Sequence, residues 1–278
     1  MNKVILIFLA CLLGVSFAQA QTSKAFFDSV IKNEDEKAKT PIALPHVERQ
    51  DVDWMKTVWR EIVLSEKMNL PLYYPTVPMD GRMSLIDVLM MGIEKSFKTA
   101  YEEDECLTPL TIDDIKQKFG GGTEIFQRRD EETGEMADVT VENEIHTEEV
   151  KRIQVKELWF FNKRTSRMEV RIISICPIRE YTKDDVEGIL KRELFWVDYG
   201  EFRDLFVKQQ VYNFQNDALR LSLDDVFLKR YFSSRIIKET NPYDNRSIQK
   251  YSAGIDAILA SEEIKREIFN KEQDLWEY

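Results

Sequence analysis

Two dense apolar runs flank a short polar bend near the middle of the chain. The first run reads VKELWFFN, the second reads MEVRIISIC, and the bend between them reads KRTS. Both runs are rich in aromatic and β-branched residues, which pack well on a half-buried pleated surface. One face of the second run carries Met168, Val170, Ile172 and Ser174. This pattern therefore predicts a long β-hairpin with one buried face over residues 155–176.

A two-stranded hairpin is only marginally stable in water, so this one needs further strands and a helical layer over its apolar face. The helices and strands that we expect along the chain do not alternate regularly, which argues against a doubly wound parallel sheet. We therefore predict an α+β fold. Its antiparallel sheet is centred on the hairpin and covered by several helices, and residues 51–278 form a single domain.

Apolar periodicity predicts where the helices lie. The pairs Trp54/Met55, Val58/Trp59 and Ile62/Val63 recur every four residues, which is typical of one helical face, and they predict a helix over 52–68. The other helices that we expect cover residues 84–96, 111–119, 201–208, 222–231 and 262–275.

Further strands are expected around the hairpin. Short strands are predicted at 98–101 and 194–199, and a segment near 139–145 is predicted to pair beside the hairpin because its apolar residues alternate with polar ones. Pro177 is expected to end the second arm, since proline cannot donate a ladder hydrogen bond.

The first twenty residues have the pattern of a secretory signal peptide. Lys3 precedes an uncharged apolar run, and Ala18-Gln19-Ala20 offers the small residues that a signal peptidase accepts. We predict cleavage after Ala20. A lipid anchor on Cys11 is the alternative, but the apolar run continues past it. Residues 21–50 are expected to form an N-terminal arm and a linker.

The charge balance argues against a nucleic-acid partner. The chain carries 39 Lys and Arg against 50 Asp and Glu, a formal net charge of -11. The basic residues are scattered singly or in pairs, so no stripe that could follow a phosphate backbone is visible.

Removal of the signal peptide leaves two cysteines, Cys106 and Cys176, in a compartment where disulfides persist. They are candidates for a disulfide. Alternatively, each is a small buried apolar residue, which suits Cys176 at the end of a core strand. The sequence leaves both interpretations open.

Three hydroxyl residues, Thr111, Thr182 and Ser222, are each separated from a following pair of aspartates by one residue. Paired carboxylates are typical of metal sites and of glycosidases. A Ser or Thr followed by acidic residues is also the usual start of a helix, where it satisfies free backbone N–H groups and complements the helix dipole. We interpret all three as helix caps.

Other motifs that carry chemistry elsewhere are incomplete in this chain. The acidic run 102–105 lacks the ligand spacing of a calcium loop, and Gly120–Gly122 lacks the Lys-Ser or Lys-Thr of a phosphate loop. His46 and His146 are the two histidines, and they lack zinc-ligand spacing. We therefore predict no catalytic, cofactor or metal site.

Several long segments point together to one family. They read WREIVLSEKMNLPLYYP, ELWFFNKRTSRMEVRIISICP, LSLDDVFLKRYFSSRIIKETNPYD and SEEIKREIFNKEQDLWEY. Through these segments, from about residue 51 to 278, the chain resembles the gliding-motility family GldN, called PorN in non-gliding relatives. Residues 182–192 and the N-terminal arm match no pattern of that family.

The resemblance implies a role in protein export. The family is a periplasmic component of the type IX secretion system of Bacteroidetes. The implied partners are an outer-membrane lipoprotein of the GldK or PorK kind, with further copies of the chain in a ring beneath the outer membrane, and the periplasmic part of the GldM or PorM inner-membrane motor. The resemblance implies no enzymatic activity and no cofactor.

Two hypotheses of different class follow. The first is a structural ring subunit that works by binding, with some of its Trp and Tyr residues as interface anchors. The second is a secreted enzyme or ligand-binding protein that acts alone. The incomplete catalytic motifs favour the first.

Overall fold

The computed structural model describes residues 39–79, 81–129, 136–143, 146–183, 186–214 and 221–274. The chain divides into two units, residues 1–39 and 40–278, and the fold below is that of the second unit. The predicted signal peptide and most of the N-terminal arm lie outside the described residues.

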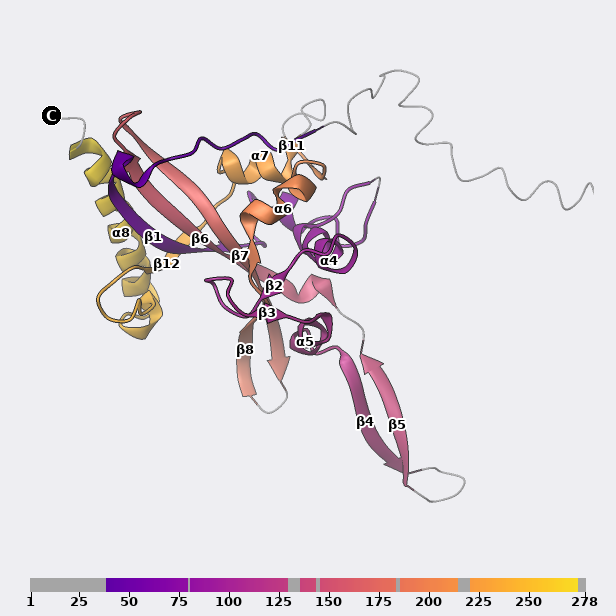
Figure 1. Ribbon diagram of the computed structural model, residues 1–278. Coiled ribbons are helices and arrows are strands. Elements are labelled where there is room, and N and C mark those ends of the chain that lie inside the picture. The colour runs from indigo at the N-terminus through magenta and orange to yellow at the C-terminus, as the bar shows by residue number, and fades with distance from the viewer. Residues whose placement is uncertain are drawn as a thin grey trace, which may run out of the picture. The chain divides into compact units, whose positions relative to one another are not determined.

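Antiparallel strands form one central sheet of six strands (Figure 1). Five of them lie in the order β12-β1-β6-β7-β8, and β9 also pairs with β7. The α+β prediction, with its antiparallel sheet, is confirmed. The strands of this sheet are β1 Val52–Val63, β6 Val150–Asn162, β7 Arg167–Lys183, β8 Val186–Glu193, β9 Val197–Asp198 and β12 Arg235–Glu239.

The predicted hairpin is confirmed as β6 and β7, which pair from Asn162 opposite Arg167 to Val150 opposite Arg179. The prediction that Pro177 ends the second arm is wrong, because β7 continues past it to Lys183. On its other side β7 pairs with β9 at Ile175 and with β8 from Ile178 onward. Pro177 lies at the change between these partners, where its missing N–H costs no ladder bond.

The predicted helix over 52–68 is wrong, because residues 52–63 form β1. This strand pairs with β6 along its length, from Trp54 opposite Phe161 to Val63 opposite Arg152. A spacing of four residues fits one face of a helix, but four is also a multiple of the strand period of two. Trp54, Val58 and Ile62 therefore share one face of the sheet instead of one face of a helix.

Helices α4 to α7 lie near their predicted positions, α8 begins earlier than expected, and α3 was not predicted. They are α3 Leu70–Tyr73, α4 Leu85–Lys95, α5 Ile112–Lys118, α6 Tyr199–Phe206, α7 Leu223–Leu228 and α8 Gly254–Asp274, with short 3-10 turns at η1 Arg49–Asp51, η2 Thr147–Glu149 and η3 Ile248–Lys250.

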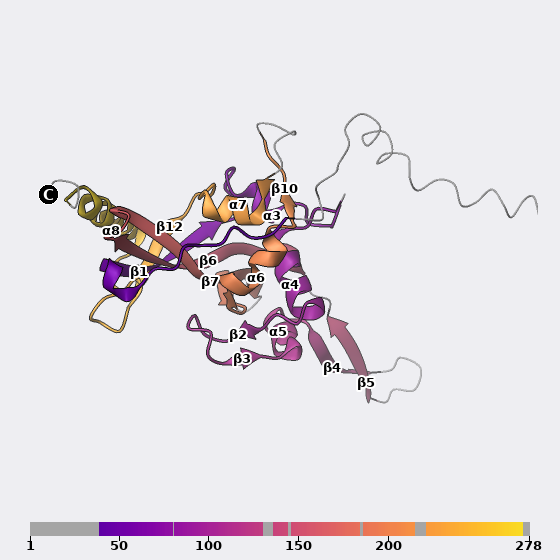
Figure 2. The same cartoon turned by 45° about the horizontal axis from the view of Figure 1, so that its top comes forward.

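Short strand pairs lie outside the central sheet. They are β2 Ala100–Tyr101 with β3 Pro109–Leu110, β4 Gly122–Arg129 with β5 Met136–Asn143, and β10 Gln210–Val211 with β11 Leu221–Ser222. The prediction that residues near 139–145 pair beside the hairpin is wrong, because β5 pairs with β4, apart from the central sheet in both views (Figure 2).

The two faces of the central sheet are covered differently. On one face, which we call the helix face, Ile62 and Val155 belong to a large core that includes residues of α4, α6 and α7. Farther along the same face, Val58 packs in a smaller core with Ile264 and Ile268 of α8. The opposite face, which we call the loop face, carries Trp59, Lys156 and Ser174 in adjacent register positions and is covered there by the β2–β3 loop.

Ile62 tests this assignment, because it lies on the helix face with no exposed surface, opposite Ile153. We expect Ile62→Asp to lower the free energy of unfolding by roughly 3–5 kcal/mol, since it buries a charge among the apolar side chains of the large core. Urea unfolding measures the change. Ile189→Asp is the control, because Ile189 in β8 is 64% exposed. Equal stability of the two variants would contradict the assigned faces.

Candidate interaction site

Helix α8 contacts the helix face through a narrow stripe. Its buried residues are Ser261, Ile264 and Ile268, and the Ser261 hydroxyl accepts a hydrogen bond from the backbone N–H of Ile236 in β12 (3.0 Å). Several large apolar side chains of the helix are exposed: Ile255, Ile258, Leu259 and Phe269. Most of the helix surface is therefore open to solvent or to a partner.

A buried charge cluster lies beside α8 on the helix face. The Glu157 side chain has no exposed surface and makes ion pairs with Arg60 Nε and Arg230 Nη1, each at 2.9 Å. Trp159 Nε1 donates to the same carboxylate (3.0 Å). Both guanidinium groups lie over the Trp159 ring, 5.6 and 5.3 Å from its centroid, within the range of cation–π attraction.

The cluster leaves an excess of positive charge, because two guanidinium groups share one carboxylate. Burial lowers the pKa of the Arg60 guanidinium, and the neighbouring Glu157 carboxylate opposes that shift. An arginine remains charged across the physiological range even so. The cluster is therefore a fixed cationic feature of this face.

An open pocket of about 650 Å³ lies on one flank of α8, and we call it the arginine pocket. Arg60, Arg230 and Trp159 line it from the sheet side. Lys265 and Phe269 line it from α8, and Phe269 is 57% exposed. The pocket thus combines cationic groups with aromatic walls, a composition suited to an anionic partner with an apolar side chain.

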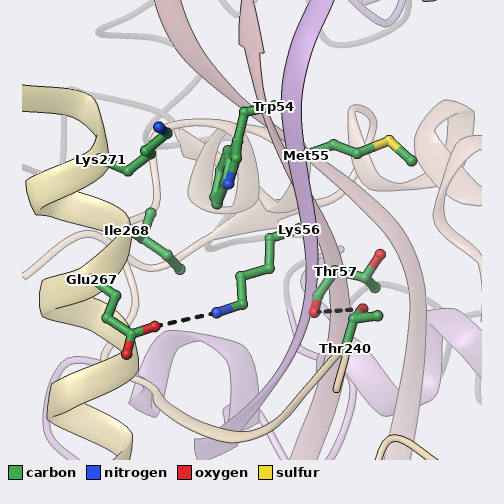
Figure 3. Close-up of a pocket in the computed structure, with 8 residues that line it drawn as sticks. All are labelled: Trp54, Met55, Lys56, Thr57, Thr240, Glu267, Ile268 and Lys271. Atoms are coloured by element: carbon green, nitrogen blue, oxygen red, sulfur yellow. Dashed lines mark hydrogen bonds and ion pairs between the residues drawn. The ribbon is translucent and has the colours of Figure 1, made fainter. Parts of the chain in front are cut away.

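A second pocket, of about 510 Å³, lies on the other flank of α8 (Figure 3). Lys56 makes ion pairs there with Glu267 (3.4 Å) and with Glu239 (2.5 Å). Figure 3 shows Ile268 between Lys271 and Glu267 along the helix. Ile268 lines both pockets, so the two flank the same helical turn. Because two carboxylates neutralise Lys56, the second pocket attracts an anion less strongly than the arginine pocket does.

The β2–β3 loop packs on the loop face through Asp104. Its carboxylate accepts a hydrogen bond from Trp59 Nε1 (2.7 Å), and its backbone carbonyl accepts from the Ser174 hydroxyl (3.1 Å) and from Lys156 Nζ (3.3 Å). Leu107, between Asp104 and β3, is 69% exposed. The middle of the loop is thus held against the sheet, while Leu107 remains exposed.

Cys106 and Cys176 are free thiols that pack in the same small cluster as Trp59 and Trp196. Burial raises the pKa of the Cys106 thiol to about 11 and raises that of Cys176 well above its usual value. Both are therefore protonated near neutral pH, and neither has the thiolate character of a nucleophile. Their pairing stays a prediction, which counting free thiols in the purified protein would test.

The three residues interpreted as caps have different positions. The Thr111 and Ser222 side chains accept hydrogen bonds from the backbone N–H of Asp114 and Asp225, at the starts of α5 and α7. The interpretation is wrong for Thr182, which lies in β7 opposite Ile189. The same hydroxyl-then-acid pattern therefore precedes a helix in two places and ends a strand in the third.

Asp224, the first acidic residue after Ser222-Leu223, has a structural role that the sequence did not reveal. Its carboxylate accepts hydrogen bonds from the Tyr199 hydroxyl (2.6 Å) and, at both oxygens, from Arg203 (3.0 Å each). All three side chains are buried. The interaction joins α6 to α7, and the i, i+4 spacing of Tyr199 and Arg203 was its one visible signal.

The remaining motifs lie apart from one another. Glu102 makes an ion pair with Lys118, Gly120 has a φ of 76° just after α5, and His146 precedes η2. His46 lies near the hairpin bend, where its carbonyl accepts from Arg164. Within the residues that the structure describes, no group of three or more His, Cys, Asp or Glu side chains could hold a metal ion.

An apolar surface lies on another part of the unit, beside a pocket of about 380 Å³ lined by α3, the segment after it and β10. Its exposed side chains are Tyr74, Met79, Tyr212 and Phe214. Exposed apolar groups gathered in one place often mark an interaction surface.

Glu157 is the residue on which the charge cluster depends. We expect Glu157→Gln to lower the free energy of unfolding by roughly 3–5 kcal/mol, because it leaves two guanidinium groups without their counter-charge. Glu262→Gln is the control, since Glu262 is exposed and pairs with Lys265 at 3.4 Å. Thermal and urea unfolding of both variants measure the effect. If Glu157→Gln proved as stable as the control, the cluster would not stabilise the fold.

Ser222 tests the helix caps. We expect Ser222→Ala to cost about 1 kcal/mol of unfolding free energy, because it removes the acceptor for the backbone N–H of Asp225. Thr182→Ala removes the same hydroxyl from a strand and should change stability by less than about 0.5 kcal/mol. If the two substitutions cost the same in urea unfolding, the capping hydrogen bond contributes nothing.

Comparison with known proteins gives the family. In the described part of the chain no helix is both long enough and apolar enough to cross a membrane. No curated protein matches the chain. The model of the family described as gliding motility associated protein GldN matches residues 47–277, well over half of the chain. The chain therefore belongs to the GldN family, a component of gliding motility and type IX secretion.

Proposed function

We propose that this chain is a structural subunit of the type IX secretion apparatus. In this role it assembles with an outer-membrane lipoprotein of the GldK or PorK kind into a periplasmic ring, and it contacts the periplasmic part of an inner-membrane motor of the GldM or PorM kind. The family match carries the proposal, because it spans residues 47–277 and so covers nearly all of the unit 40–278.

Periplasmic placement is part of the same proposal. The apolar run after Lys3 and the Ala18-Gln19-Ala20 site support export with a cleavable signal peptide. After cleavage the chain would begin at Gln21, and a lipoprotein partner would hold it at the inner face of the outer membrane.

The described surfaces suit a protein that works by binding. The arginine pocket presents Arg, Trp and Phe side chains, and Trp and Arg are enriched among the residues that dominate interface energies. The apolar surface at Tyr74 and Phe214 lies on different elements from this pocket. A subunit that meets several partners needs separate surfaces of this kind.

A stand-alone ligand-binding protein is the second candidate. The arginine pocket, at about 650 Å³, lies within the size range of small-molecule sites. A ligand-binding protein of this kind would bind its ligand without a lipoprotein partner, and its loss would leave protein export intact.

Deletion of the gene separates the two candidates. We expect a deletion strain to retain type IX cargo inside the cell, because the apparatus lacks a structural part. Restoring the full chain should restore export, which immunoblots of culture medium measure for one cargo protein and one control protein of another export route. Normal cargo export in the deletion strain would contradict the proposed function.

Deletion of the lipoprotein partner is the reciprocal experiment. We expect this chain to move to the soluble periplasmic fraction or to be degraded, because a subunit loses the stability that binding supplies. An unchanged level and unchanged membrane association would contradict the lipoprotein contact. Electron microscopy of the co-expressed pair tests the ring directly.

A further inference from the structure

The β2–β3 loop and the arginine pocket lie on opposite faces of the central sheet. Lys156 and Glu157 are consecutive in β6, so their side chains point to opposite faces. Lys156 lies on the loop face under the β2–β3 loop. Glu157 lies on the helix face under the arginine pocket, paired to Arg60 and Arg230. The loop and the pocket of one chain therefore lie on opposite sides of the sheet.

The exposed part of the β2–β3 loop is acidic, and we call residues 102–107 the acidic loop. Glu103 and Glu105 are exposed, and neither forms an ion pair with another residue of the described chain. Leu107 lies beside them, 69% exposed. The contacts of Asp104 with Trp59 and Ser174 hold the middle of the loop against the sheet, so ordering the loop against a partner would cost little entropy.

The arginine pocket has the complementary chemistry. Its lining includes four cationic residues, Arg60, Arg230, Lys265 and Arg266, against two carboxylates, Glu262 and Glu272. The buried Glu157 beneath it still leaves one positive charge in excess. This excess lies in a chain whose net charge is -11.

Arg266, at the rim of the arginine pocket, is available to pair with a carboxylate of a partner. It is exposed and forms no ion pair with any residue in the described ranges. Phe269 and Met68, 57% and 53% exposed, provide apolar surface at the same pocket. An acidic segment that carries a leucine thus meets both a charge partner and an apolar wall here.

We infer that the acidic loop of one copy docks into the arginine pocket of the next copy. This inference rests on the proposed function, since it specifies the contact between neighbouring subunits of the ring. A loop and a pocket on opposite faces form a heterologous, head-to-tail contact, which generates rings when the rotation closes. A self-complementary patch would stop at a dimer.

Charge reversal tests the contact in the full chain co-expressed with its lipoprotein. The first variant carries Glu103→Lys with Glu105→Lys, and the second carries Lys265→Glu with Arg266→Glu. We expect each to lower the yield of rings by about tenfold or more, because like charges then face each other. Electron microscopy and sedimentation of the purified complexes measure the yield.

The chain with all four substitutions is the decisive variant. Its acidic loop has become basic and its pocket acidic, so ring yield should return towards that of the unmodified chain. The matched control carries Asp256→Lys with Glu263→Lys, which makes the same change of charge at two exposed positions of α8 outside the pocket. This control should assemble normally.

Three results would overturn the inference. The first is an unchanged ring yield in both twofold variants, and the second is a loss of rings in the control. The third is no recovery of rings in the fourfold variant although its melting temperature equals that of the unmodified chain. If the first or the third result is found while the unmodified chain forms rings, only this inference fails and the proposed function stands. Failure of the unmodified chain to form rings with its lipoprotein would count against the proposed function itself.

Discussion

A carboxylate that solvent does not reach lies at the centre of the helix face. Glu157 in β6 receives Arg60 from β1 and Arg230 from the segment after α7, and Trp159 donates to it as well. Three separate parts of the chain are thereby held by one group. A buried charge is tolerated only when it is paired and hydrogen-bonded. Pairing of Glu157 therefore requires both the observed register of β1 against β6 and the observed position of the segment after α7. The cluster also separates the large core under α4, α6 and α7 from the small core under α8.

How much of the fold could be predicted from the sequence depends on how far apart in the chain the residues that form each element lie. The hairpin was predictable, because its two arms and its bend are contiguous and rich in strand-forming residues. β1 was not, since its apolar spacing of four residues fits a helix and a strand equally, and only pairing with β6 decides between them. Thr182 shows the same limit, because a hydroxyl followed by acidic residues starts a helix only where the following residues turn away from a sheet.

The candidate site was largely hidden from sequence reasoning for a related reason. Its cationic groups come from Arg60, Arg230 and Lys265, which no local pattern connects. The acidic run at 102–105 was visible only as a sequence without calcium-loop spacing, and the structure adds that Asp104 holds the run against the loop face. Family membership names the machinery, while the surfaces of the chain suggest how a subunit of that machinery meets its neighbours.

The hydrogen bond from Ile236 to the Ser261 hydroxyl (3.0 Å) has a consequence for the chain outside its assembly. β12 is the terminal strand of the sheet, and a terminal strand with free backbone donors is a template for pairing with strands of other molecules. Helix α8 blocks that template at Ile236. Helix α8 contacts the sheet through a narrow stripe only. Its proteolytic loss would therefore expose the unpaired edge of β12, and the cleaved chain would aggregate before it could assemble with its partners.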